Sequence, residues 1–281
     1  MGKLRKSLAK VPLLGPSLLR VQRALIGLGY FRQPLLDLGR WVFTSSENTN
    51  FTYDLDALNT RYLTSMLADV LGLDFDVVGG YIAEITDDDE LSRHIAARTA
   101  ASDLTFRADG RARLGRRVGW YAVVRALKPC VVIESGVDKG LGACVLAAAL
   151  LRNAEEGHPG RYYGTDVDRE AGYLLAGRYA DVGEILYGDS RESLEKFAGT
   201  IDLFINDSDH SAAYEASEYS AIEHKLSERA VVLGDNSRDS GALLDFSLRA
   251  GRRFVYFQER PSNHWYPGAG IGVSFRRWAS G

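Results

Sequence analysis

Acidic residues follow the predicted strands in the second half of the sequence, where carboxylates can bind ligands or take part in catalysis. Short apolar runs rich in β-branched residues predict these strands, and the acids lie at their ends or in the turns that follow. The acids are Glu134, Asp166, Asp189, Asp207 and Asp235. Because ligands of an open α/β sheet bind at the carboxyl ends of its strands, we expect the five side chains to line one crevice.

A glycine-rich turn, E-S-G-V-D-K-G-L-G from Glu134 to Gly142, joins the first of these strands to an apolar helix. Gly136 and Gly140 let the backbone approach a ligand at the helix N-terminus. Their G-x-x-x-G-x-G spacing differs from the G-x-G-x-x-G of nicotinamide-binding proteins, which disfavours an oxidoreductase of that kind. An acid before the first glycine suits a cationic sulfonium ligand better than a pyrophosphate.

The next two acids suit the two parts of an adenosyl group. Asp166 can accept hydrogen bonds from both ribose hydroxyls, and Asp189, followed by Ser190, lies where an adenine amino group needs an acceptor. Taken singly, each acid is also explained as a turn former or a helix cap. The ordered series on successive strands therefore favours a nucleoside-binding site.

The elements that position these residues alternate between strands and helices, which predicts a parallel sheet. The predicted strands span 130–135, 161–166, 184–189, 201–207, 230–235, 253–259 and 271–277. The last two are joined by a loop without a helical pattern, so we expect them to be antiparallel. The predicted fold class is α/β, a Rossmann-like doubly wound sheet that is mostly parallel with an antiparallel C-terminal strand.

Residues before this region show apolar spacing typical of helices. We therefore predict a helical N-terminal cap or lid over 1–114 and a ligand-binding catalytic domain over 115–281. The helical part could equally serve as a dimer interface, which makes a homo-oligomer a second expectation.

Charge is unevenly distributed, because residues 1–40 contain eight lysines and arginines against Asp37 alone. This pattern indicates either a helix that contacts an anionic membrane surface or partner, or the solvated face of a surface helix. No stretch is apolar enough to predict a transmembrane segment. The second half is not basic, so we expect no nucleic-acid partner.

Two cysteines, Cys130 and Cys144, lie in apolar runs and are predicted to be reduced core residues. A cytoplasmic location is expected on this basis.

The series E-x-G-x-x-x-G, G-x-D and G-D-S resembles that of class I S-adenosylmethionine (SAM)-dependent methyltransferases. The resemblance covers about the last 165 residues. It implies that SAM binds at Glu134, Gly136 and Gly140, with its ribose at Asp166 and its adenine near Asp189 and Ser190.

The remaining acids resemble those of metal-dependent O-methyltransferases of the catechol and macrocin (antibiotic-sugar) groups. In those groups an Asp follows the fourth strand and an Asp-Asn or Asp-Asp pair follows the fifth. The resemblance implies Mg²⁺ ligands at Asp207, Asp235 and Asn236, since Mg²⁺ prefers oxygen donors. His210 is then the expected general base, and Asp209 is the competing candidate.

Histidine stands where the catechol group has a lysine, which favours hydroxyls of sugars or natural-product scaffolds as the methyl acceptor. Asn236 is shared with the catechol group, so the evidence on the subgroup is mixed. Two other functions are compatible with part of the pattern. Asp207-Ser208-Asp209 is also the D-x-D of metal-dependent glycosyltransferases, and a non-catalytic SAM-fold binding protein would keep the same turn.

Overall fold

The computed structural model describes residues 15–47, 52–103 and 111–276 of the chain. Contacts divide it into two units, Met1–Ser45 with Asn263–Tyr266, and Ser46–Ser262 with Pro267–Gly281. The basic residues before position 15 lie outside the described part. The predicted division into 1–114 and 115–281 stays a prediction.

The first unit consists of helix α2 (Gly15–Thr44) and the short segment Asn263–Tyr266. The ring of Trp41 meets that of Trp265 edge-on, with 5.5 Å between their centroids. No helix within the described residues combines the length and apolarity needed to cross a membrane.

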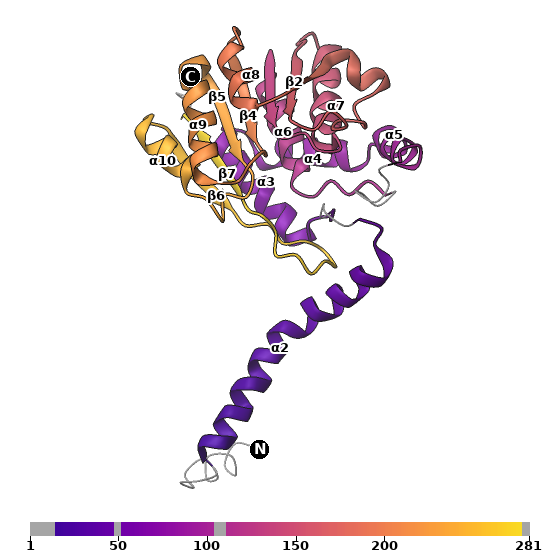
Figure 1. The fold of residues 1–281 in the computed structure, drawn as a ribbon, viewed down its shortest axis with the longest axis vertical. Coiled ribbons are helices and arrows are strands. Elements are labelled where there is room, and N and C mark those ends of the chain that lie inside the picture. Colours follow the sequence, from indigo (N-terminus) through magenta and orange to yellow (C-terminus); the bar gives the residue numbers. More distant parts are fainter. Residues whose placement is uncertain (1–14, 48–51, 104–110, 277–281) are drawn as a thin grey trace. The chain divides into compact units, whose positions relative to one another are not determined.

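The second unit contains a seven-stranded sheet in the order β3-β2-β1-β4-β5-β7-β6 (Figure 1). Its strands are β1 (Val131–Ser135), β2 (Arg161–Asp166), β3 (Gly183–Tyr187), β4 (Ile201–Asn206), β5 (Leu226–Gly234), β6 (Arg253–Phe257) and β7 (Ile271–Phe275). β1 to β5 pair in parallel, whereas β7 runs antiparallel to both β5 and β6. The predicted mostly parallel sheet with an antiparallel C-terminal strand is confirmed.

Helices connect these strands and precede them. They are α3 (Ala57–Leu71), α4 (Phe75–Thr86), α5 (Asp89–Ala100), α6 (Arg117–Leu127), α7 (Leu141–Glu155), α8 (Ser190–Lys196), α9 (Ala212–Ile222) and α10 (Ala242–Arg249), with 3₁₀ turns at Gly177–Val182 and Glu223–Lys225. Acids begin two of the helices before the sheet. The side chains of Asp56 and Asp88 accept backbone N–H groups of α3 and α5, which satisfies donors that a helix start leaves free.

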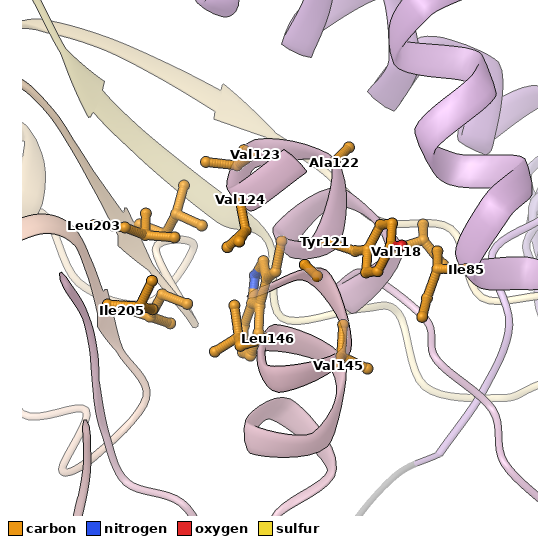
Figure 2. Packing of buried hydrophobic residues seen from close by; sticks show 14 of the residues in the cluster. Ile85, Val118, Tyr121, Ala122, Val123, Val124, Val145, Leu146, Leu203 and Ile205 are labelled. Atoms are coloured by element: carbon orange, nitrogen blue, oxygen red, sulfur yellow. The ribbon is translucent and has the colours of Figure 1, made fainter. Parts of the chain in front are cut away.

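Alternate residues of the central strands enter two separate cores, as a period of two requires. In β4, Leu203 and Ile205 pack with α6 and α7, whereas Phe204 packs against Tyr219 of α9. Figure 2 shows the first core, in which side chains of α6, such as Val124, lie against Leu146 of α7. The sheet is thus held between two layers of helices, which leaves the carboxyl ends of its strands open for ligands.

Of the two cysteines, Cys144 is buried in α7 as predicted, but Cys130 is exposed. The prediction that both are core residues is therefore wrong for Cys130. It stands just before β1, where the chain has not yet entered the core.

Candidate active site

A pocket of about 460 Å³ lies at the carboxyl ends of β1 to β4. It is lined by Gly136, Asp138, Thr165, Asp166, Val167, Gly188, Asp189, Ser190, Asp207, Ser208, Asp209 and Tyr214. Four of the six residues predicted to bind the cofactor, Gly136, Asp166, Asp189 and Ser190, meet there. Glu134 and Gly140 are not among the lining residues. Of the five acids expected to line one crevice, Asp166, Asp189 and Asp207 line this pocket, whereas Glu134 and Asp235 do not.

Gly136 and Gly140 give the turn after β1 its shape. Gly136 has a φ of 81°, and a Cβ atom at this position would overlap the carbonyl oxygen of Asp207. Gly140 has a φ of 95° and immediately precedes α7. Both positions need the left-handed region that glycine adopts without strain, and Gly136 also needs the absent side chain.

Asp166, at the end of β2, binds this turn with its carboxylate. Its Oδ2 atom accepts the backbone N–H groups of Val137 at 3.0 Å and Asp138 at 2.9 Å. Its Oδ1 atom accepts the N–H of Asp168 at 2.9 Å. A carboxylate oxygen can accept more than one hydrogen bond, so Oδ1 retains capacity for a further donor such as a ribose hydroxyl.

Glu134 lies at the end of β1 and is 1% exposed. Burial raises the pKa of its carboxyl to about 7, although the Tyr162 hydroxyl, 2.5 Å from Oε2, opposes this shift. A Cβ atom at Gly142 would overlap Oε1 of Glu134. The side chain therefore packs beneath the start of α7, and its contact with a cofactor stays a prediction.

Asp189 begins α8 and is already engaged by neighbouring groups. Its Oδ2 atom lies 2.6 Å from Nη2 of Arg191, and its Oδ1 atom accepts the Tyr214 hydroxyl at 3.1 Å. The hydrogen bonds from Arg191 hold the pKa of Asp189 below its usual value. Ser190 is buried, and its hydroxyl donates to Glu218. An adenine amino group would have to share Asp189 with these donors.

Three of the residues predicted to lie near a metal come together at Asp207, which is the one of them that lines the pocket. One side-chain ligand atom from each of Asp207, His210 and Asp235 lies within 4.8 Å of the others. Asp207 follows β4 and Asp235 follows β5, which are adjacent in the sheet. Burial, and next the Asp235 carboxylate, raise the pKa of Asp207 well above its usual range.

The guanidinium of Arg116, just before α6, partly neutralises this acidic group. Its Nη2 atom lies 2.5 Å from Oδ2 of Asp235 and 3.6 Å from Oδ2 of Asp207. On its other side, Nη1 donates to the Tyr53 hydroxyl at 3.4 Å and lies 4.0 Å from Oε1 of Glu259. Burial opposes the charge of Arg116, but Asp235 and Glu259 raise its pKa above the usual value.

One carboxylate oxygen of the same group has no hydrogen-bond partner among the described residues. Oδ1 of Asp235 is buried without a hydrogen-bond partner, whereas its Oδ2 atom is taken by Arg116. Two carboxylates with such an atom fit a hard divalent cation. The third member of the described group is His210. Asn236 directly follows Asp235 with a φ of 54°, and its part in binding a metal stays a prediction.

The two candidate bases have different surroundings. His210 is about one third exposed, with Nε2 3.8 Å from Oδ1 of Asp207 and Nδ1 3.8 Å from Oε1 of Glu215. Asp209 is exposed, and the backbone N–H of Ser211 donates to it, which lowers its pKa. A carboxylate of lowered pKa is a weaker base, so the surroundings favour His210 over Asp209.

Sequence reasoning missed Arg116, Tyr53 and Glu259, which surround the acidic group. Glu259 accepts the Tyr53 hydroxyl at 3.0 Å and the backbone N–H groups of Ala269 and Gly270. The only signal was the pair Arg116-Arg117 before an amphipathic helix. Nothing in that pair indicates which distant acids it will contact.

Comparison with known proteins places the site in a methyltransferase domain. Residues 133–237 match the model of a family described as a methyltransferase domain. No curated protein matches the sequence.

Several solved structures are similar in fold. The cofactor-bound Rv0187 protein from MTB is 19% identical with a TM-score of 0.50, covering 65% of this chain and 88% of its own. The SAH-bound methyltransferase PaMTH1 of Podospora anserina is 16% identical with a TM-score of 0.48, covering 67% and 88%. The SAM-bound O-methyltransferase TomG of Streptomyces achromogenes, involved in tomaymycin synthesis, is 17% identical with a TM-score of 0.48, covering 68% and 90%.

The matched residues begin in β1 and end just after β5, so they include every strand that contributes to the pocket. They contain the glycine turn and the acids of β1 to β5. The sequence match and the strand order together assign residues 133–237 to a methyltransferase domain with a Rossmann-like sheet.

Proposed function

We propose that the chain methylates a hydroxyl group of a small molecule, such as a sugar or a natural-product scaffold, with the help of Mg²⁺. One observation supports this proposal above the others. The pocket that contains Gly136, Asp166 and Asp189 also reaches Asp207, which belongs to the acidic group with His210 and Asp235. A cofactor and an acceptor hydroxyl could therefore meet at Asp207.

A free alcohol is a poor nucleophile, so its methylation needs a way to remove the hydroxyl proton. When bound at Asp207, Asp235 and Asn236, Mg²⁺ would supply positive charge that favours the deprotonated hydroxyl. The donors fit such an ion, because the carboxylates are close together and one buried oxygen of Asp235 has no partner. Arg116 shares these carboxylates and limits how much negative charge is left for the ion.

In this scheme the residues of the site have separate roles. Asp166 and the glycine turn bind the adenosyl part of SAM, and Asp207 with Asp235 orients the acceptor side. His210 removes the hydroxyl proton, which moves to an imidazole nitrogen. The O–CH₃ bond forms as the S–CH₃ bond breaks, and the electron pair of the broken bond remains on sulfur as S-adenosylhomocysteine leaves.

A glycosyltransferase that uses Asp207-Ser208-Asp209 is the weaker candidate. Asp209 is exposed and accepts the backbone N–H of Ser211 in the turn before α9, which explains its place without a metal. A glycosyltransferase function would also give no role to the glycine turn and Asp166.

The first test is calorimetric titration of the full chain with S-adenosylhomocysteine, with and without Mg²⁺, and with UDP-sugars and NAD⁺ as controls. We expect binding of S-adenosylhomocysteine alone among these ligands. A heat signal with a nucleotide sugar and none with S-adenosylhomocysteine would contradict the proposal.

The metal and the base are tested with variants once an acceptor has been found in a screen of hydroxylated sugars and phenols. Asp207→Ala and Asp235→Ala should abolish turnover and largely spare S-adenosylhomocysteine binding. Asp239→Ala, which changes an exposed acid four residues after Asp235, is the matched control and should change neither. Full activity in the presence of a chelator would exclude the metal.

His210→Ala should lower kcat by about 10²- to 10⁴-fold, as expected for loss of a general base. Asp209→Asn should lower it much less. The opposite order would assign the base to Asp209.

A further inference from the structure

Helix α2 exposes an unusual amount of apolar surface. It carries 12 of the 21 large apolar side chains that are exposed within the described residues. Tyr30 is 81% exposed and Phe43 is 87% exposed. Apolar surface that is gathered on one element, rather than scattered singly, indicates a binding surface for a protein or a membrane.

The apolar residues of α2 follow a helical period. Val21, Leu25, Leu28, Leu35 and Val42 recur at spacings of three, four and seven residues, and each is between 56% and 61% exposed. Residues at these spacings form one stripe along a helix. At a rise of about 1.5 Å per residue, the stripe extends over roughly 30 Å.

The charge of α2 indicates what this stripe contacts. The helix contains Arg20, Arg23, Arg32 and Arg40, all exposed, against Asp37 as its one acid. Asp37 is itself engaged by Gln33 and lies 3.5 Å from Arg40. The 14 residues that precede the helix in the sequence add Lys3, Arg5, Lys6 and Lys10 and no acid. Apolar side chains mixed with positive charge complement an anionic lipid surface.

A second copy of the helix is a poorer partner. The seven-residue spacing of Val21, Leu28, Leu35 and Val42 would make these residues one half of a coiled-coil seam. Ala24, Phe31 and Leu38 would complete such a seam, but Leu25, Ile26 and Leu36, each more than half exposed, would stay outside it. Two such helices would also bring like charges together.

We propose that α2 binds along the surface of a membrane that contains anionic lipids, with its stripe in the boundary between headgroups and acyl chains and its arginines on lipid phosphates. The long side chain of arginine can lie along apolar surface and still place its charge at the headgroups. The proposal is independent of the acceptor of the methyl group.

The test is flotation of the full chain with two kinds of vesicle. One contains phosphatidylcholine alone, and the other also contains about one quarter phosphatidylglycerol. The protein should float with the anionic vesicles and remain unbound with the neutral ones. Leu25→Asp with Leu28→Asp should lower binding to the anionic vesicles more than about tenfold, since it replaces the centre of the stripe by charge. Replacing Arg20, Arg23 and Arg32 by Gln should lower it about fivefold for each arginine.

The matched control is Leu248→Asp, because Leu248 is 69% exposed on α10 in the other unit. This variant should float as the original chain does. All variants should still bind S-adenosylhomocysteine, so that a failure of the methyltransferase proposal is seen separately. The proposal is overturned if the chain does not float with anionic vesicles, or if the leucine variant floats unchanged. It is also overturned if the chain is instead a dimer in solution that the leucine variant converts to a monomer.

Discussion

Two groups of carboxylates lie at the carboxyl ends of the strands, and they differ in how their negative charge is compensated. On the cofactor side, Asp166 and Asp189 accept hydrogen bonds from backbone N–H groups, from Arg191 and from Tyr214. On the other side, Asp207 and Asp235 crowd each other, share Arg116 and leave one buried oxygen without a partner. In the first group Asp166 holds a turn in one shape, whereas the crowded carboxylates of the second group can be compensated further by a bound cation or a proton.

The two sides meet at Gly136, where we expect the largest effect. A Cβ atom there would overlap the backbone of Asp207, so Gly136→Ala must move either the turn or the acidic group. We expect a loss of more than about 3 kcal/mol in the free energy of unfolding and no measurable S-adenosylhomocysteine binding. Chemical denaturation and calorimetry measure these two quantities.

Gly157→Ala is the matched control for this variant. Gly157 has a similar φ of 85°, but open space surrounds the position of its Cβ atom. It should show only the cost of the left-handed conformation, about 1 kcal/mol. Equal losses in the two variants would mean that the contact with Asp207 does not matter.

The Arg116→Gln variant removes the positive charge that compensates the acidic group. It leaves buried carboxylates without their counter-charge, so we expect a loss of about 3–5 kcal/mol in the free energy of unfolding. Mg²⁺ or Mn²⁺ should restore part of this loss and raise the Tm of the variant more than that of the original chain.

Arg117→Gln is the control, since Arg117 lies 3.8 Å from Asp207 and does not contact Asp235 within the described ion pairs. Its Tm should respond to the cations no more than that of the original chain. If Arg116→Gln gains nothing from either cation, the acidic group is not a cation site.

The fold could be predicted from the sequence because the patterns that indicate strands and helices are local. Runs such as 201–207 and 230–235 are too short for helices and rich in β-branched residues, and their alternation with helices leaves few possible sheets. The meeting of Asp166, Asp189 and Asp207 in one pocket followed from the same rule, because the carboxyl ends of parallel strands share an edge.

Other features depended on contacts that no local pattern encodes. Arg116 and Asp235 are 119 residues apart, and only the packing of α6 beside the sheet brings them together. Asp166 was predicted to bind ribose, but the sequence did not indicate that its carboxylate also holds the turn. Cys130 begins an apolar run and is nevertheless exposed, since burial starts within β1.

The raised pKa of Glu134 allows a test of how burial of a carboxyl on the cofactor side affects stability. Its pKa is raised from 4.5 to about 7 by burial, so the folded chain keeps this proton where the unfolded chain loses it. The stabilisation is complete below pH 4.5 and is lost as the pH rises to about 7, a decrease of about 3 kcal/mol in the free energy of unfolding. Glu134→Gln should be less sensitive to pH over this window, and an unchanged slope would show that other groups cause it.

Asp166→Asn and Asp189→Asn compare the two acids of the cofactor side and should give the smallest effects. An amide has a single acceptor oxygen, so Asp166→Asn loses part of its hold on the turn, at about 1–3 kcal/mol of unfolding free energy. S-adenosylhomocysteine should bind this variant more than about tenfold more weakly. Asp189→Asn, just before α8, should weaken binding less, because Tyr214 and the backbone of Arg191 can still donate to the amide oxygen. A larger loss for Asp189→Asn would mean that direct contact with the adenine, rather than the shape of the turn, determines the affinity of the pocket.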